Sequence, residues 1–154
     1  MATKADFNAE EWSTVVEGPL LAGMRVVLAH GGGTIRETMA IGKVYTEARQ
    51  AQGQSELLDA LVASPPTLDR ERIKGKSDVA RESTERLREA LAILGEKGSP
   101  EDVEGYKQLV LAIAQAAAEA HKEGGFIGIG GKPISDEEKA ALDEIRAVLD
   151  GQAG

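Results

Sequence analysis

The sequence predicts an all-α fold, and three observations carry this prediction. Of the 154 residues, 42% are hydrophobic but only 3% are aromatic, which favours packing through small and aliphatic side chains. The helix-favouring residues Ala, Leu, Glu and Arg are abundant. Apolar residues recur at spacings of three and four behind helix-capping residues. We expect one domain, residues 1–154, built as a compact bundle of about six or seven helices.

Charge and composition exclude several classes of function. The formal net charge is −8, so the chain as a whole repels DNA and RNA, and we expect no nucleic-acid partner. The absence of cysteine excludes disulfides and thiolate sites and is compatible with the cytosol. The N-terminal residues lack the apolar core of a signal peptide, and the apolar runs are shorter than the ~20 residues that span a bilayer. We therefore expect a cytoplasmic protein with no membrane insertion.

The first helix is predicted from a capping pattern. Asn8 with Glu11 three positions later is typical of a capping box, so a helix should begin at about Ala9. Pro19 has no backbone N–H, and we expect it either to kink this helix or to end it and begin another. The apolar residues of 20–29 predict a helix that is buried nearly all round, and the glycine run after it ends the helix.

Two shorter helices and a charged loop are predicted next. Thr34 with Glu37 repeats the capping pattern, and a short amphipathic helix should cover 55–63. The charged stretch 67–78 predicts a solvated loop rather than an anion site, because its basic residues alternate with acids and no aromatic residue accompanies them. The apolar stripe of the helix after Thr34 is expected to comprise Ile35, Met39, Ile41, Val44 and Ala48.

The remaining chain predicts three more helices. Ser77 is expected to cap the first of them, and Ser99, with Pro100 at the first helical position, to cap the second. Within this second helix, residues 109–118 include only one polar residue, which indicates a central position in the bundle. The last helix should begin at Ser135 and run to about residue 149.

The two ends of the chain resemble each other and predict a duplicated helical hairpin, residues 8–48 and 99–149, connected by 49–98. At an offset of 91 residues the equivalent pairs are Asn8 and Ser99, Glu10 and Glu101, Leu20 and Leu111, and His30 and His121. Beyond the histidines the offset is 101, so the second copy has ten extra residues in its loop. A real duplication predicts a pseudo-twofold bundle, whereas chance similarity between alanine- and glutamate-rich helices is the alternative.

This longer loop contains the glycine-rich stretch GGFIGIGGKP, residues 124–133. A phosphate-binding loop would need a glycine at Phe126 and a hydroxyl residue after Lys132, where the chain has proline. A calcium loop would need side-chain oxygens at Ile127 and Ile129. We interpret the stretch as an apolar loop that either folds back onto the bundle or contacts a partner. Its candidate partner-binding residues are Phe126, Ile127, Ile129 and Lys132.

Candidates for metal binding and catalysis are few. His30 and His121, with Glu37 and Glu138, form two equivalent sets that could hold a divalent metal, but capping explains both glutamates and helix ends explain both histidines. The chain has no cysteine and no nucleophile motif, and the acidic residues at 10, 11, 101 and 102 are interpreted as first-turn and capping residues. We expect no catalytic residue and no cofactor, with the metal as the alternative.

The order of cap, acidic turn, apolar helix, glycine turn, capping box and helix, and the ending GKPISDEEKAALDEIRAVL, resemble those of an uncharacterised bacterial all-helical family. More distantly, 8–48 and 99–149 are similar to TerB-like tellurite-resistance proteins and to the N-terminal module of DjlA-type co-chaperones. The resemblance implies a helical bundle with internal pseudo-symmetry and an association with stress responses, membrane-linked complexes and, in some members, metal ions. In place of the family's acidic turns this chain has HGGG and GIGGKP, so only Glu37 and Glu138 match its metal-binding carboxylates.

Together these features predict a non-enzymatic helical protein-interaction module in a bacterial stress-response or envelope-associated system, with an unidentified protein partner. A metal or small-ligand binding protein of the TerB-like type is the first alternative, and an enzyme with a site between the buried helices is the second. Homo-oligomerisation is compatible with the sequence.

Overall fold

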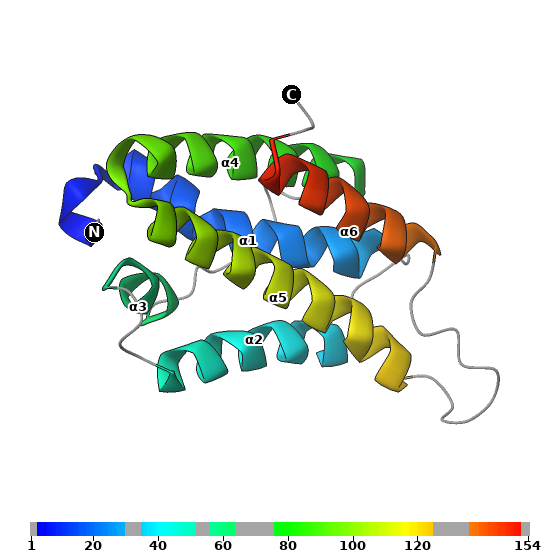
Figure 1. Cartoon of the computed structure of the whole chain (residues 1–154). Coiled ribbons are helices and arrows are strands. Elements are labelled where there is room, and N and C mark those ends of the chain that lie inside the picture. Colours follow the sequence, from blue (N-terminus) through cyan, green and yellow to red (C-terminus); the bar gives the residue numbers. More distant parts are fainter. Residues whose placement is uncertain (1–2, 30–34, 52–55, 64–75, 125–135, 152–154) are drawn as a thin grey trace.

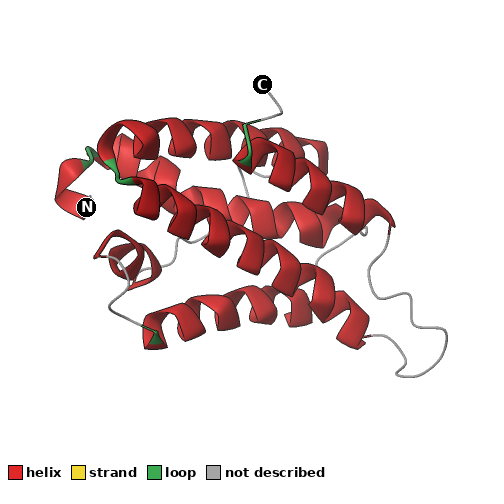
Figure 2. Ribbon diagram, viewed as in Figure 1, coloured by secondary structure: helices red, strands yellow, loops and turns green. Residues whose placement is uncertain are grey.

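The computed structural model describes residues 3–29, 35–51, 56–63, 76–124 and 136–151, and all regular structure in these ranges is helical (Figures 1 and 2). The all-α prediction is confirmed. Within the described ranges, six α-helices follow a short 3₁₀ helix, η1 (Lys4–Asp6). They are α1 (Ala9–Ala29), α2 (Ile35–Gln50), α3 (Glu56–Ala63), α4 (Lys76–Lys97), α5 (Pro100–Gly124) and α6 (Asp136–Leu149).

Helix α1 lies at the centre of the bundle. It packs along α4 and α5 and also contacts α6 and α2 (Figure 1). Helix α2 packs mainly on α5, and α3 contacts both of them near the first turns of α5. Helix α6 lies against α1, α4 and α5. One hydrophobic core therefore runs through the bundle, with side chains from all six helices.

Local capping sets two of the helix starts as predicted. At α1, the Asn8 N–H donates to Glu11 Oε1 at 2.9 Å and the Glu11 N–H donates to Asn8 Oδ1 at 2.8 Å. At α5, Ser99 and Asp102 exchange the corresponding bonds at 3.0 and 3.2 Å. The predicted cap at Ser77 is wrong, because α4 already begins at Lys76. A serine followed by an acidic residue is tolerated in a first turn, where free N–H groups favour negative charge.

The first turn of α1 is also tied to the last turn of α4. Lys97 Nζ lies 2.5 Å from Glu11 Oε1, donates to the Asp6 carbonyl at 3.1 Å, and lies 5.8 Å from the centre of the Phe7 ring. The backbone N–H of Asn8 and the Lys97 ammonium hold the pKa of Glu11 below its usual value. The capping carboxylate thus has a second role, which is to fix α4 against the N-terminal segment.

Helix α1 continues through Pro19, so of the two predicted outcomes, a kink or a helix end, the helix end is wrong. Because proline has no N–H, the Val15 carbonyl four residues earlier loses its helical partner. The Tyr106 hydroxyl of α5 donates to this carbonyl at 2.8 Å. A Cβ atom on Gly18 would lie only 2.2 Å from the same hydroxyl, so glycine is required for its approach. Burial raises the pKa of Tyr106, and its hydroxyl is therefore a neutral donor.

The apolar runs form the core largely as predicted. No residue of 20–29 is exposed, and in the predicted central stretch of α5 six of the ten residues are buried. Gly23 allows α1 to approach Ile113 and Ile41, since a Cβ at this position would lie under 3.0 Å from both side chains. The expected stripe on α2 is wrong at Met39, which is 68% exposed; among residues 39–50, whose burial is described, the buried positions are Ile41 and Tyr45. These two residues are four apart, as one face of a helix requires.

The helix starts follow the two offsets of the predicted duplication. Helix α5 begins at Pro100, 91 residues after α1, and α6 begins at Asp136, 101 residues after α2. The bond from Tyr106 to Val15 also spans 91 residues and thus joins equivalent positions. The extra loop residues lie outside the described residues, and the common origin of the two halves stays a prediction.

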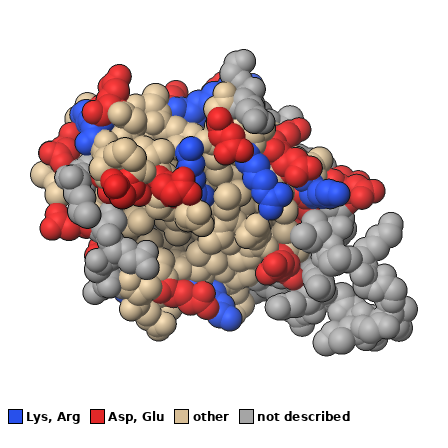
Figure 3. Space-filling view, viewed as in Figure 1, with Lys and Arg blue, Asp and Glu red and all other residues tan. Residues whose placement is uncertain are grey.

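Part of the protein surface carries no charged side chains. Figure 3 shows a broad uncharged area in the middle of one face, over α5, whose residues 108–118 include no charged residue. Among the described residues, no helix has both the length and the apolarity needed to cross a bilayer. Charged residues of α1, α4 and α6 line two pockets.

Candidate functional site

For most of the site residues predicted from the sequence, the structure does not describe the position of the side chain. Phe126, Ile127, Ile129 and Lys132 fall outside the described residues, as does His30. His121 lies in α5 and Glu37 in α2, near the helix ends expected for them, and the structure describes no side-chain contacts for either residue. The partner role of the glycine-rich loop therefore stays a prediction.

Glu138 is the one predicted metal ligand whose surroundings are described. It lies in the first turn of α6 and its side chain is fully buried. Its predicted capping partner, Ser135, lies outside the described residues. Within the described part of the chain, no group of three or more His, Asp or Glu side chains could hold a metal ion. The structure thus offers no described partners with which Glu138 would bind a metal.

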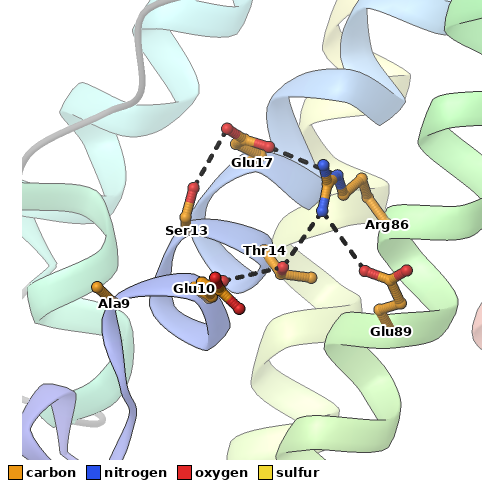
Figure 4. A pocket seen from close by; sticks show the side chains of 7 residues that line it. All are labelled: Ala9, Glu10, Ser13, Thr14, Glu17, Arg86 and Glu89. Atoms are coloured by element: carbon orange, nitrogen blue, oxygen red, sulfur yellow. Dashed lines mark hydrogen bonds and ion pairs between the residues drawn. The ribbon is translucent and has the colours of Figure 1, made fainter.

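The structure instead shows a cleft between the first half of α1 and the middle of α4, which we call the Arg86 cleft (Figure 4). Its volume is about 470 Å³. Ligand pockets in proteins are commonly of this size. The residues that line it are Ala9, Glu10, Ser13, Thr14, Glu17, Arg86 and Glu89.

Helical spacing explains how these residues meet. On α1, the lining residues at 10, 13, 14 and 17 are three, four and seven apart and so share one face. On α4, Glu82, Arg86 and Glu89 are four and three apart and share another. The long contact between α1 and α4 places the two faces opposite each other. The cleft thus combines two short polar patterns that lie about 70 residues apart in the sequence.

Arg86 lies at the α4 side of the cleft, and the side chains of Thr14, Glu17 and Glu89 point toward it (Figure 4). Its Nε lies 3.6 Å from Glu17 Oε2 and 3.8 Å from Glu82 Oε2, and its Nη1 lies 3.5 Å from Glu89 Oε2. Nη1 also donates to Thr14 Oγ1 at 3.4 Å. The Arg86 side chain is 28% exposed and that of Glu89 is 58% exposed, so water screens these interactions.

The cleft carries an excess of negative charge. Its lining includes three carboxylates, Glu10, Glu17 and Glu89, against the single guanidinium of Arg86, which leaves a formal net charge of −2. The hydroxyl of Ser13 donates to Glu17 Oε1 at 3.3 Å and adds a polar group that can reorient. Such an arrangement attracts a cationic group and provides hydrogen-bond acceptors for it.

A second, smaller pocket lies between α1, α4 and α6, and we call it the Arg25 pocket. Its volume is about 280 Å³, and it is lined by Arg25, Ala29, Ala80, Glu137, Ala140, Ala141 and Glu144. Arg25 donates from Nη1 to Thr84 Oγ1 at 2.9 Å and forms an ion pair with Glu144 through Nη2. Partial burial lowers the pKa of Arg25, and arginine nevertheless remains charged in proteins.

Sequence reasoning missed both pockets. The pattern at Glu10 predicts a first-turn residue, and no role is predicted for Arg86 or for Arg25 within its apolar run. That run did contain a signal, because a single arginine in a helix buried nearly all round must find a polar partner. The partner cannot be identified from the sequence, because Thr84 and Glu144 lie on helices that are distant in the chain.

Comparisons with known proteins add no assignment. No protein-family model matches the chain, and searches of curated proteins and of solved structures find no significant match.

Proposed function

We propose that the protein is a non-enzymatic, cytoplasmic protein-interaction module that binds a basic segment of a partner protein in the Arg86 cleft. The observation that carries the proposal is the excess of carboxylates in a cleft of about 470 Å³. The net charge of −8 on the whole chain draws basic partners toward this surface and repels nucleic acid. A bacterial stress-response or envelope-associated role, which the TerB-like resemblance implies, belongs to the same proposal.

The lining residues suit a lysine or arginine side chain. Glu10 and Glu89 are exposed and lie on opposite walls, one on α1 and one on α4, so a cationic side chain can enter between them. Arg86 keeps Glu82 as a partner on its own helix when Glu89 turns to the incoming group. The cleft can thus exchange its half-exposed ion pairs for intermolecular ones at little cost in folding stability.

A short lysine-rich peptide labelled with a fluorophore tests the proposal by anisotropy. The double variant Glu10→Gln with Glu89→Gln should weaken binding about tenfold, since each lost exposed charge pair contributes at most ~1 kcal/mol. The matched control is Glu85→Gln with Glu96→Gln, which removes the same charge from exposed positions of α4 outside the cleft. The control should retain nearly the affinity of the wild type at physiological salt.

Two outcomes would reject the cleft as the binding site. One is equal weakening by the two double variants, which would show that only the overall charge attracts the peptide. The other is no binding of the peptide by the wild-type protein. If the peptide does bind in the cleft, a photo-crosslinking residue in place of Ser13 identifies the cellular partner. The crosslinked segment of that partner should be basic.

A further inference from the structure

The Arg25 pocket is separate from the Arg86 cleft and has a different chemical character. Three helices each contribute one face to it. Helix α1 contributes Arg25 and Ala29, which are four apart, and α4 contributes Ala80. Helix α6 contributes two alanines and the two glutamates Glu137 and Glu144, which are seven apart and share one face. Cationic, anionic and apolar groups thus converge on one small space.

Arg25 is a positioned cation on the inner side of this pocket. Its side chain is only 11% exposed, whereas that of its ion-pair partner Glu144 is 62% exposed. Thr84 accepts a hydrogen bond from Nη1 and itself donates to the Ala80 carbonyl at 3.0 Å, so α4 fixes the guanidinium plane. Of the five N–H donors of an arginine, the single one on Nε makes no hydrogen bond or ion pair with the described residues. The guanidinium can therefore donate a hydrogen bond to a further carboxylate.

The carboxylates lie on the outer side of the pocket. Glu137 and Glu144 are both exposed, and Glu137 makes no ion pair within the described part of the chain. Both side chains line the same space as Arg25. A ligand that reaches Arg25 with an anionic group thus places its next few atoms beside two negative charges. That position suits an ammonium group and disfavours a second anionic group.

The rest of the lining is methyl groups. Ala29, Ala80, Ala140 and Ala141 are the smallest side chains that still provide an apolar wall. The volume of about 280 Å³ is slightly below the usual range for ligand pockets, ~300–1,000 Å³. The pocket therefore fits a compact molecule with a short aliphatic part and excludes a nucleotide or a peptide.

We propose that the Arg25 pocket binds a small aliphatic α-amino acid in its zwitterionic form. The ligand carboxylate joins Arg25, the ammonium lies between Glu137 and Glu144, and the aliphatic side chain packs on the four alanines. Binding adds one anion and one cation, so no buried charge is left without a counter-charge. Recognition of both ends of the ligand distinguishes an amino acid from a fatty acid and from an amine.

Isothermal calorimetry with purified protein tests this assignment with three matched compounds. L-Valine carries both charged groups, 3-methylbutanoate lacks the amino group, and 2-methylpropylamine lacks the carboxylate. Valine should bind, and each of the other two should bind at least about tenfold more weakly, because each leaves one set of pocket charges without a partner. Valine should also raise the melting temperature in proportion to the logarithm of its concentration.

Two variants separate the pocket from the rest of the surface. Ala140→Trp fills the pocket from an exposed position, and Lys139→Trp adds the same side chain at an exposed neighbour that does not line the pocket. The first should abolish valine binding with little change in melting temperature, and the second should leave binding unchanged. Glu137→Gln should weaken valine binding about tenfold without weakening that of 3-methylbutanoate.

Three results would overturn the proposal. They are no heat and no thermal shift at millimolar valine, equal binding of valine and 3-methylbutanoate, and equal effects of the two tryptophan variants. None of them bears on the Arg86 cleft, because the two pockets share no residue.

Discussion

Helix α1 contacts its two main neighbours in opposite ways. Toward α5 it presents Gly18 and the Val15 carbonyl, and the contact contains a buried hydrogen bond, 2.8 Å long, from Tyr106. Toward the middle of α4 it presents a polar face whose interactions with Arg86 are 3.4 Å or longer and partly exposed. The number of polar interactions is therefore a poor guide to which contact stabilises the fold.

Burial explains the difference between the two contacts. A polar group without a partner in the core costs about 1–3 kcal/mol, so the Tyr106 bond is worth most of that amount. An exposed ion pair contributes at most ~1 kcal/mol, because water replaces either partner readily. The α1–α5 contact is thus specialised for stability, and the α1–α4 cleft remains available for exchange with a ligand.

The largest expected effect tests the close approach at Gly18. Gly18→Ala places a Cβ 2.2 Å from the Tyr106 hydroxyl, and Tyr106 is fully buried and cannot move aside freely. We expect a loss of about 3 kcal/mol or more in the free energy of unfolding, from overpacking and from the lost hydrogen bond. Urea denaturation measures it.

Gly95→Ala is the matched control for this prediction. Gly95 lies in α4, is exposed, and has open space where a Cβ would stand. This change should stabilise the protein by up to ~1 kcal/mol through helix propensity. If both alanine variants had the same effect on stability, the close approach of Tyr106 would not be the reason that position 18 requires glycine.

The next largest effect is expected when the two tyrosines of the chain are each replaced by phenylalanine and the changes in stability are compared. Tyr106→Phe leaves the Val15 carbonyl without its donor and should cost about 1–3 kcal/mol. Tyr45 is also buried, but its hydroxyl makes no hydrogen bond with the described residues, and burial raises its pKa. Tyr45→Phe should therefore be neutral or slightly stabilising. A larger loss for Tyr45→Phe than for Tyr106→Phe would contradict the role of the Val15 bond.

A double-mutant cycle then tests why Tyr106 is needed. Pro19→Ala restores an N–H that can bond the Val15 carbonyl within the helix. In that background Tyr106→Phe should cost less than in the wild type, by about 1 kcal/mol, because the carbonyl has a second donor. Additive effects of the two changes would show that proline and tyrosine act independently.

The sequence predicts local features of this fold well. Helix starts at Asn8 and Ser99 follow from side chains that bond the backbone three residues away, so the pattern alone reveals them. The outcome at Pro19 depends on the Tyr106 hydroxyl, which lies 91 residues after the Val15 carbonyl to which it donates, and no local pattern shows it. Met39 was assigned to the apolar stripe because it is hydrophobic, yet its helical position faces water.

The candidate sites were harder to predict for a related reason. Arg86 and Glu17 lie on helices whose own patterns are those of ordinary solvated faces, and only the packing of α1 on α4 joins them. Arg25 is the one charged residue in the apolar run 20–29, but its partners Thr84 and Glu144 come from two other helices. The sequence instead favours the histidines and the glycine-rich loop. Both are rare features in a chain that is otherwise rich in alanine and glutamate.

The smallest expected effect concerns the cleft itself. Arg86→Gln removes three partly exposed ion pairs and should cost about 1 kcal/mol or less, and less still at high salt, because screening already weakens them. Arg146→Gln, which removes a more exposed pair with Asp143, should have almost no effect. A loss for Arg86→Gln that exceeds that of Tyr106→Phe and persists at high salt would mean that the cleft is a structural contact. The exchange of its carboxylates with a basic partner would then be too costly for the proposed function.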